Sequence, residues 1–123
     1  MKAIDVRAWN REKNVMYTPI LCCGCVYRGE RDFEDGIDCE DPVMLYTGLQ
    51  DKNGTEIYEG DILRVIRPHK SYTIERIGQV IFGSLGRFQI KGDKIHCAFN
   101  HIVNYEWEVI GNIYQNLESL KEN

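Results

Sequence analysis

The sequence predicts a mainly β fold, in which short strands form a small barrel and one short helix ends the chain. Two observations support this prediction. Apolar residues alternate with polar ones in most segments, which is the period of a strand with one buried face. Glycine-containing turns separate these segments. A barrel is favoured over an open sheet because closure removes exposed strand edges.

The first predicted element is a hairpin near the N-terminus, formed by "AIDVRAW" and "NVMYTPIL" around a short polar loop. Two longer strands follow in "DILRVIR" and "SYTIERIGQVIF". The second contains Gly78, and a glycine inside a strand often marks a bulge or a tight corner. A late strand is predicted in "YEWEVIG", with Tyr105, Trp107 and Val109 on one face and two glutamates on the other.

Residues 87–99, "RFQIKGDKIHCAF", predict a further hairpin with a two-residue Gly-Asp turn. This turn would pair Lys91 with Lys94 and place Ile90 opposite Ile95, with the apolar side chains on one face. The C-terminal segment "NLESLKEN" has helical spacing and a plausible N-cap in its first residue. We therefore expect a two-turn helix there that docks through its leucines.

The stretch "YTGLQDKNGTEIYEGDIL" between these hairpins is rich in glycine and acidic residues. Asp51, Asn53 and Thr55 have the spacing of the first ligands of a calcium-binding loop. The match fails later, because Glu56 stands where the turn glycine belongs and Ile62 where the last glutamate belongs. Asn-Gly and Gly-Asp pairs instead predict tight turns. The residues expected to fix these turns are Gly48, Asp51, Asn53, Gly54, Gly60 and Asp61.

The predicted core follows from the apolar faces of these strands. The residues expected to be mostly buried are Leu45, Tyr58, Ile62, Phe82, Phe88, Ile90, Phe99, Trp107 and Val109.

Length and charge set the limits of this prediction. A chain of 123 residues is a common size for one compact domain, so we expect a single domain over residues 1–123. The net charge of -4 gives no global attraction for polyanions, and a nucleic-acid partner would need a local patch. Neither a membrane-spanning stretch nor an apolar leader is present in the sequence, which predicts a cytoplasmic protein without a membrane partner.

Three blocks of the sequence carry a family resemblance. "RAWNREKNVMY", "YTGLQDKNGTEIYEGDIL" and "EVIGNIYQN" closely resemble the YopX family of phage and prophage proteins, in the order that the family has them. The resemblance implies a largely β, barrel-containing YopX-like fold, a phage or prophage genome in a bacterial host cell, and self-association. The family has no established biochemical activity, so the resemblance assigns no catalytic residues.

The five cysteines include a C-x-x-C pair, Cys22 and Cys25, with Cys23 between them. An odd number of cysteines without an export signal predicts reduced thiols rather than a disulfide network. Zinc would need two further ligands, and the remaining cysteines and histidines supply no second pair at ligand spacing. We predict no cofactor, and whether these three cysteines bind a metal stays open.

The sequence offers no assembled catalytic group. His96 and Cys97 are neighbours on a predicted strand, so their side chains point to opposite faces and cannot form a nucleophilic pair. Nucleophile-elbow, phosphate-loop and dinucleotide motifs are absent from the sequence. The acidic run "GERDFEDGIDCEDP" is typical of a solvated surface loop. We therefore predict a protein that is not an enzyme.

One local basic patch suggests a binding function. The segment "RVIRPHKSYTIER" brings cationic side chains together around a hairpin with an aromatic ring among them, a combination that single-stranded nucleic acids bind. The candidate residues are Arg64, Arg67, Lys70, Tyr72 and Arg76. The preferred prediction remains a non-enzymatic homo-oligomer that binds a host or phage protein, and the alternative is a nucleic-acid-binding module that uses this patch.

Overall fold

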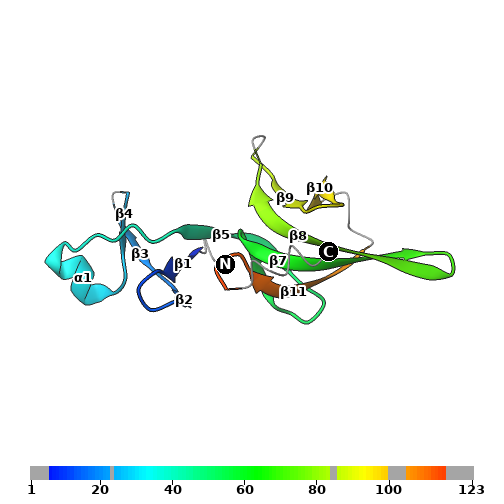
Figure 1. Cartoon of the computed structure of the whole chain (residues 1–123). Coiled ribbons are helices and arrows are strands. Elements are labelled where there is room, and N and C mark those ends of the chain that lie inside the picture. Colours follow the sequence, from blue (N-terminus) through cyan, green and yellow to red (C-terminus); the bar gives the residue numbers. More distant parts are fainter. Residues whose placement is uncertain (1–5, 23, 84–85, 100–104, 116–123) are drawn as a thin grey trace. The chain divides into compact units, whose positions relative to one another are not determined.

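The computed structural model describes four stretches of the chain, residues 6–22, 24–83, 86–99 and 105–115 (Figure 1). Contacts along the chain gather into two compact units, Met1–Tyr46 and Thr47–Asn123. Strand β5 (Val43–Gln50) continues from the first unit into the second. The single domain expected from chain length stays a prediction.

The first unit begins with the predicted N-terminal hairpin, which is confirmed. Strand β1 (Val6–Asn10) pairs antiparallel with β2 (Val15–Tyr17), and β1 also pairs with the start of β5. The side-chain oxygen of Asn10 accepts hydrogen bonds from two backbone N–H groups of the connecting turn, at 3.0 Å each. Ala8 and Trp9 are buried, so this hairpin carries the apolar interior of the unit.

A smaller hairpin and a helix follow in the same unit. Strands β3 (Ile20–Cys22) and β4 (Cys25–Tyr27) pair antiparallel, and helix α1 (Glu30–Asp35) comes next. This helix occupies part of the acidic run that was expected to be a loop. Gly36 ends it in the left-handed conformation, and the Phe33 ring packs edge-on against Tyr27 at 5.2 Å. This contact joins the helix to β4, and a helix this short needs such tertiary support.

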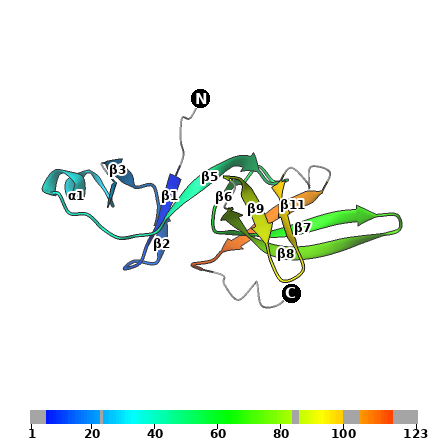
Figure 2. The same cartoon turned by 90° about the horizontal axis from the view of Figure 1, so that it is seen from above.

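The second unit is built around one strongly curled sheet (Figures 1 and 2). Its five strands lie in the order β10-β9-β8-β7-β11, and the sheet curls like half a barrel, so the predicted mainly β fold is confirmed. The remaining strand β6 (Glu56–Tyr58) pairs with β5. The bounds of the sheet strands are β7 (Asp61–His69), β8 (Tyr72–Phe82), β9 (Phe88–Lys91), β10 (His96–Ala98) and β11 (Glu106–Asn112).

Strands β7 and β8 form a long hairpin that confirms the two strands predicted there. Their ladder runs without a register shift from the pair Ile62 and Gln79 to the pair His69 and Tyr72. The ladder also passes through Gly78 without a bulge. A side chain at Gly78 would come within 2.5 Å of Ile90, so this glycine allows β8 and β9 to approach where the sheet curls. The register shift lies instead in β11, between Val109 and Gly111.

The hairpin β9–β10 forms, but its predicted register is wrong. Lys91 pairs with His96 instead of Lys94, and Ile90 pairs with Cys97, a shift of two residues. A two-residue hairpin turn at Gly92 and Asp93, of type I′ or II′, would need a positive φ at Gly92, and Gly92 does not have one. Gly92 instead packs against the backbone of β8 and donates a 2.7 Å hydrogen bond to the Ile95 carbonyl. An even shift keeps Ile90 and Cys97 on one face, as predicted.

The core of the second unit lies inside the curl. Six buried residues form it, and they come from four strands and the segment after β10: Ile57, Leu63, Val65, Val80, Ile90 and Phe99. Of the predicted core residues, Ile62, Ile90 and Phe99 are buried, whereas Tyr58, Phe88, Trp107 and Val109 are half-buried.

Two predictions of burial are wrong. Leu45 is 36% exposed because its neighbour Met44, on the other face of β5, is the side chain that turns inward. Phe82 is 46% exposed at the end of β8. Among the described aromatic rings it contacts only Phe88, in an edge-to-face arrangement with the ring centres 4.9 Å apart.

The predicted C-terminal helix lies outside the described residues. Within the described part of the chain, no helix is long and apolar enough to cross a lipid bilayer.

Candidate functional site

The glycine-rich stretch between β5 and β7 is organised by Asp51. Its Oδ1 accepts hydrogen bonds from the N–H groups of Asn53 and Thr55 at 2.8 and 2.9 Å, and Gly54 takes a positive φ of 82°. Asn53 has no positive φ, so the turn is a three-residue loop closed by a left-handed glycine. The carboxylate oxygens of Asp51 are thus directed at backbone donors, which is a structural role rather than a calcium-binding one.

The same carboxylate reaches β11, the last strand of the curled sheet. Oδ2 of Asp51 accepts a 2.9 Å hydrogen bond from the N–H of Val109, and Lys52 N–H donates to the Trp107 carbonyl at 3.1 Å. The Trp107 indole N–H donates to the Gln50 carbonyl at 3.1 Å. The loop 50–55 therefore covers the outer edge of β11.

Burial and hydrogen bonding oppose each other at Asp51. Burial would raise the pKa of this carboxyl, but the backbone N–H groups of Val109, Thr55 and Asn53 stabilise its charged form and hold the pKa below the ordinary value.

The second predicted turn also forms. Gly60 has a φ of 90°, and the Asp61 carboxylate accepts a 2.8 Å hydrogen bond from Tyr58 N–H. Gly48 is likewise left-handed within β5, with φ of 86°.

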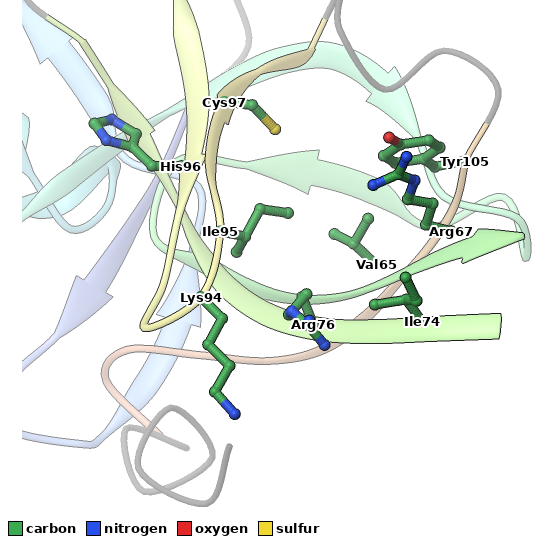
Figure 3. Close-up of a pocket in the computed structure, with 9 residues that line it drawn as sticks. All are labelled: Val65, Arg67, Ile74, Arg76, Lys94, Ile95, His96, Cys97 and Tyr105. Carbon is green, nitrogen blue, oxygen red and sulfur yellow. The ribbon is translucent and has the colours of Figure 1, made fainter. Parts of the chain in front are cut away.

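A cavity of about 350 Å³ opens on the inner face of the curled sheet (Figure 3). Its apolar floor is made by Val65, Ile74, Ile95 and Cys97, which face the hollow from opposite sides in Figure 3. The other described lining residues are Arg67, Arg76, Lys94, His96 and Tyr105, and none of the nine is acidic. The cavity is therefore a half-apolar hollow with cationic groups at its rim, which suits an anionic ligand with an apolar part.

Arg67 and Arg76 approach the cavity from neighbouring strands. Val65 pairs with Arg76 and Arg67 pairs with Ile74, and paired residues project from the same face of a sheet. The Arg67 guanidinium lies 5.8 Å from the centre of the Tyr105 ring, a cation–π contact that orients it. The guanidinium of Arg76 donates to the Glu75 carbonyl at 2.8 Å. Both cations are thus held in place at the rim.

The predicted basic patch divides between the two faces of the sheet. Arg67 and Arg76 line the cavity, and Tyr72 lies further along the same hairpin, paired with His69. Arg64 projects from the opposite face, where its guanidinium is 3.8 Å from the Glu108 carboxylate. Lys70 lies in the turn between β7 and β8. Lys94 and Tyr105 also line the cavity. The sequence did not predict their place beside Arg67 and Arg76, because they lie outside the β7–β8 hairpin.

Charge is segregated by face in this unit. The outer face of the sheet carries glutamates on β8 and β11, whereas the described lining of the cavity carries cations and no carboxylate. Lys52 also lies on the acidic side, with its ammonium 3.9 Å from Glu106. A net charge of -4 for the whole chain is therefore compatible with a cationic inner face.

The first unit contains a buried carboxylate that the sequence did not reveal. Asp41, whose side chain is 2% exposed, accepts two hydrogen bonds from the Arg28 guanidinium, at 2.7 and 3.0 Å, and one from the Tyr17 hydroxyl at 2.8 Å. The Cys39 thiol lies 3.4 Å from the same carboxylate. Tyr17, Arg28 and the segment with Cys39 and Asp41 are well separated along the chain, and no motif in the sequence links them.

The Asp41 cluster has shifted acidities. The Arg28 guanidinium holds the pKa of Asp41 well below its usual range, although burial opposes this shift. Burial and hydrogen bonds to Cys39 and Asp41 raise the pKa of the Tyr17 hydroxyl well above its usual range. Arg28 also contacts Glu12 at 3.2 Å. A carboxylate engaged in this way holds together the elements around it and offers little to a ligand.

The remaining candidate residues lie apart from one another. Cys22 and Cys25 are opposite each other in the β3–β4 ladder and both are free thiols. Cys23 lies outside the described residues. No three described histidine, cysteine or acidic residues are arranged to hold a metal ion. In Figure 3 the His96 ring points away from the cavity and the Cys97 thiol toward it, as predicted from their positions on one strand. Burial raises the pKa of this thiol.

Comparison with known proteins now gives the chain its family. A family model described as "YopX protein" matches residues 5–121, nearly the whole sequence. The chain belongs to the YopX family. The match confirms the family resemblance of the three sequence blocks.

A solved member of the same fold supports this assignment. The chain is similar to the structure titled "Crystal structure of protein EF1440 from Enterococcus faecalis", with 27% sequence identity and a TM-score of 0.65. The alignment covers 98% of this chain and 99% of that one. None of the curated proteins matches the chain. Neither the family description nor the structure title names an activity.

Proposed function

We propose that this YopX protein is a non-catalytic binding protein that holds single-stranded nucleic acid on the inner face of its curled sheet. The observation that carries the proposal is the cavity: cationic groups stand at its rim, an apolar floor lies between them, and no described lining residue is acidic. Phosphates need the cations, and the half-apolar hollow suits the faces of bases.

The geometry favours a flexible strand over a rigid duplex. The cations lie on the inner face of a curled sheet, where a strand that bends can follow the surface. Barrel-like β folds commonly bind single strands in such grooves. The preference for a host or phage protein as partner, together with phage origin, self-association and cytoplasmic location, rests on the sequence and the family resemblance.

Fluorescence anisotropy of a labelled oligothymidylate tests the proposal. With three rim cations each neutralising one phosphate, raising salt from 50 to 200 mM should weaken binding by about 20-fold. Arg67→Glu should weaken binding at least tenfold at low salt, because it replaces an attractive charge with a repulsive one.

Arg31→Glu is the matched control, since Arg31 is exposed on α1 and undergoes the same change of charge. This variant should bind like the wild type. The proposal fails if the wild type does not bind the strand at low salt, or if Arg67→Glu binds as tightly as Arg31→Glu while both variants melt at the wild-type temperature.

A further inference from the structure

The tip of the β7–β8 hairpin carries two stacked rings. His69 and Tyr72 form the last pair of the ladder, and their ring centres are 4.7 Å apart with an angle of 22° between the planes. Tyr72 is 56% exposed, the most exposed of the large described aromatic side chains. A stacked pair of this kind stabilises a hairpin, but the exposed ring face also remains available for a flat ligand.

These rings lie on the same face as the cavity. Residues that alternate along a strand project from one face, so His69 follows Arg67 on β7, and Tyr72 precedes Ile74 and Arg76 on β8. Arg76 is four positions after Tyr72, which corresponds to about 13 Å along the strand. Figure 2 shows the β7–β8 hairpin extending as an arm beyond its neighbouring strands.

The arm therefore continues the candidate interface. Beyond Ile66 and Glu75 the residues of the arm pair only with each other within the described part of the chain, so there the arm is a two-stranded ribbon. Lys70 in the turn adds a cation beside the rings. A strand held by its phosphates at Arg67 and Arg76 would have a neighbouring nucleotide within reach of the tip.

We propose that the Tyr72 ring, supported from behind by His69, is a stacking platform for one base of the bound strand. This inference rests on the proposed function. It adds that the tip of the hairpin recognises a base, whereas the cavity rim binds phosphates. Aromatic rings stack on the faces of all four bases, so the platform distinguishes nucleic acid from other polyanions without selecting a sequence. The cations at the cavity rim cannot make that distinction, because they bind phosphate alone.

The test compares two ligands of equal charge and length: a labelled oligothymidylate and an abasic phosphodiester strand. Tyr72→Ala should weaken binding of oligothymidylate about tenfold and change binding of the abasic strand less than twofold. Tyr72→Phe should bind like the wild type because it keeps the ring. Phe82→Ala removes another exposed aromatic ring of β8 and should leave both affinities unchanged.

The outcomes separate the two proposals. If the wild type binds neither strand, the proposed function itself is wrong, and the platform with it. If the wild type binds both strands and Tyr72→Ala has no effect, the cationic cavity stands and the platform is overturned. Equal losses for both strands would also overturn it, because they would indicate a general change in the arm rather than loss of base stacking.

Discussion

Among single residues, Asp41 is the clearest case of a charge that the fold requires. Its carboxylate is almost fully buried and has a bidentate partner in Arg28. Removing one member of a buried ion pair typically costs about 3 to 5 kcal/mol, because the other charge is left without its partner. Arg28 is partly exposed and also contacts Glu12, so the loss here belongs at the lower end of this range.

The first prediction concerns pH. Because the pKa of Asp41 is held below its ordinary value of 3.8, its carboxylate contributes full stability above about pH 5, and this contribution declines as the pH falls below 3.8. Asp41→Asn should lower the free energy of unfolding by about 3 kcal/mol at pH 7. Urea unfolding at several pH values should show this difference shrinking toward pH 3.

The control for this prediction is Asp35→Asn, at an exposed position near the end of α1. It should change neither the stability at pH 7 nor its dependence on pH. A constant difference between Asp41→Asn and the wild type from pH 7 to 3 would contradict the ion-pair explanation.

The second prediction tests the left-handed glycines of the motif. A Cβ atom at Gly54 would meet no atom within 4 Å, so the main cost of a substitution there comes from its φ of 82°. Gly54→Val should lower the free energy of unfolding by about 2 kcal/mol, because β-branched residues strongly disfavour this conformation. Gly54→Asn should cost much less, since asparagine tolerates it. Equal melting temperatures for the two variants would contradict the turn assignment.

At the scale of elements, the loop 50–55 explains why the motif that marks the family is rich in turn residues. Asp51 both closes its own turn and binds Val109 of β11. The register shift after Val109 lies next to this contact. Hydrogen bonds therefore fix the loop to the edge of β11, although 58 positions separate Asp51 from Val109.

The third prediction follows from this contact. Asp51→Asn keeps the shape of the side chain but replaces one acceptor oxygen with a donor, so either the turn or Val109 loses its partner. We expect a loss of about 2 kcal/mol in unfolding free energy. Hydrogen exchange should become much faster at Val109 and little changed in the β7–β8 ladder. Asp93→Asn, in an exposed loop, is the control; uniform acceleration would contradict a local role.

The sequence was informative about strands and less so about their alignment. Alternation and turn residues located the hairpins, because both are local properties. The register of β9 and β10 depended on the packing of Gly92 against β8, which is a contact between distant residues. The Asp41 cluster and the convergence of Lys94 and Tyr105 with Arg67 are likewise products of tertiary structure, so no local pattern could predict them.

At the scale of the whole molecule, self-association remains the main prediction from the family. The second unit has a further hollow of about 330 Å³, in which apolar side chains include Leu49, Phe88 and Phe99. Leu49 is 38% exposed. We expect this surface to be covered in an assembly, because exposed apolar groups favour burial between copies.

The fourth prediction is therefore a change of mass. Light scattering coupled to size-exclusion chromatography should give the wild type a mass that is a multiple of 14.3 kDa. Leu49→Glu should shift the mass toward a single chain, whereas Glu56→Gln, on β6, should not. A wild-type protein that stays a single chain at about 100 µM would contradict self-association.

The covered edge of β11 limits how copies of this chain can join. A filament made by adding strand to strand needs two open ends on every subunit, and here the backbone groups of Trp107 and Val109 on one side are already engaged. Within the described part of the five-stranded sheet, this leaves β10 as the edge where a strand can be added, so growth through this sheet stops at a pair. The loop 50–55 thus acts as a terminator of strand addition at the β11 end of this sheet.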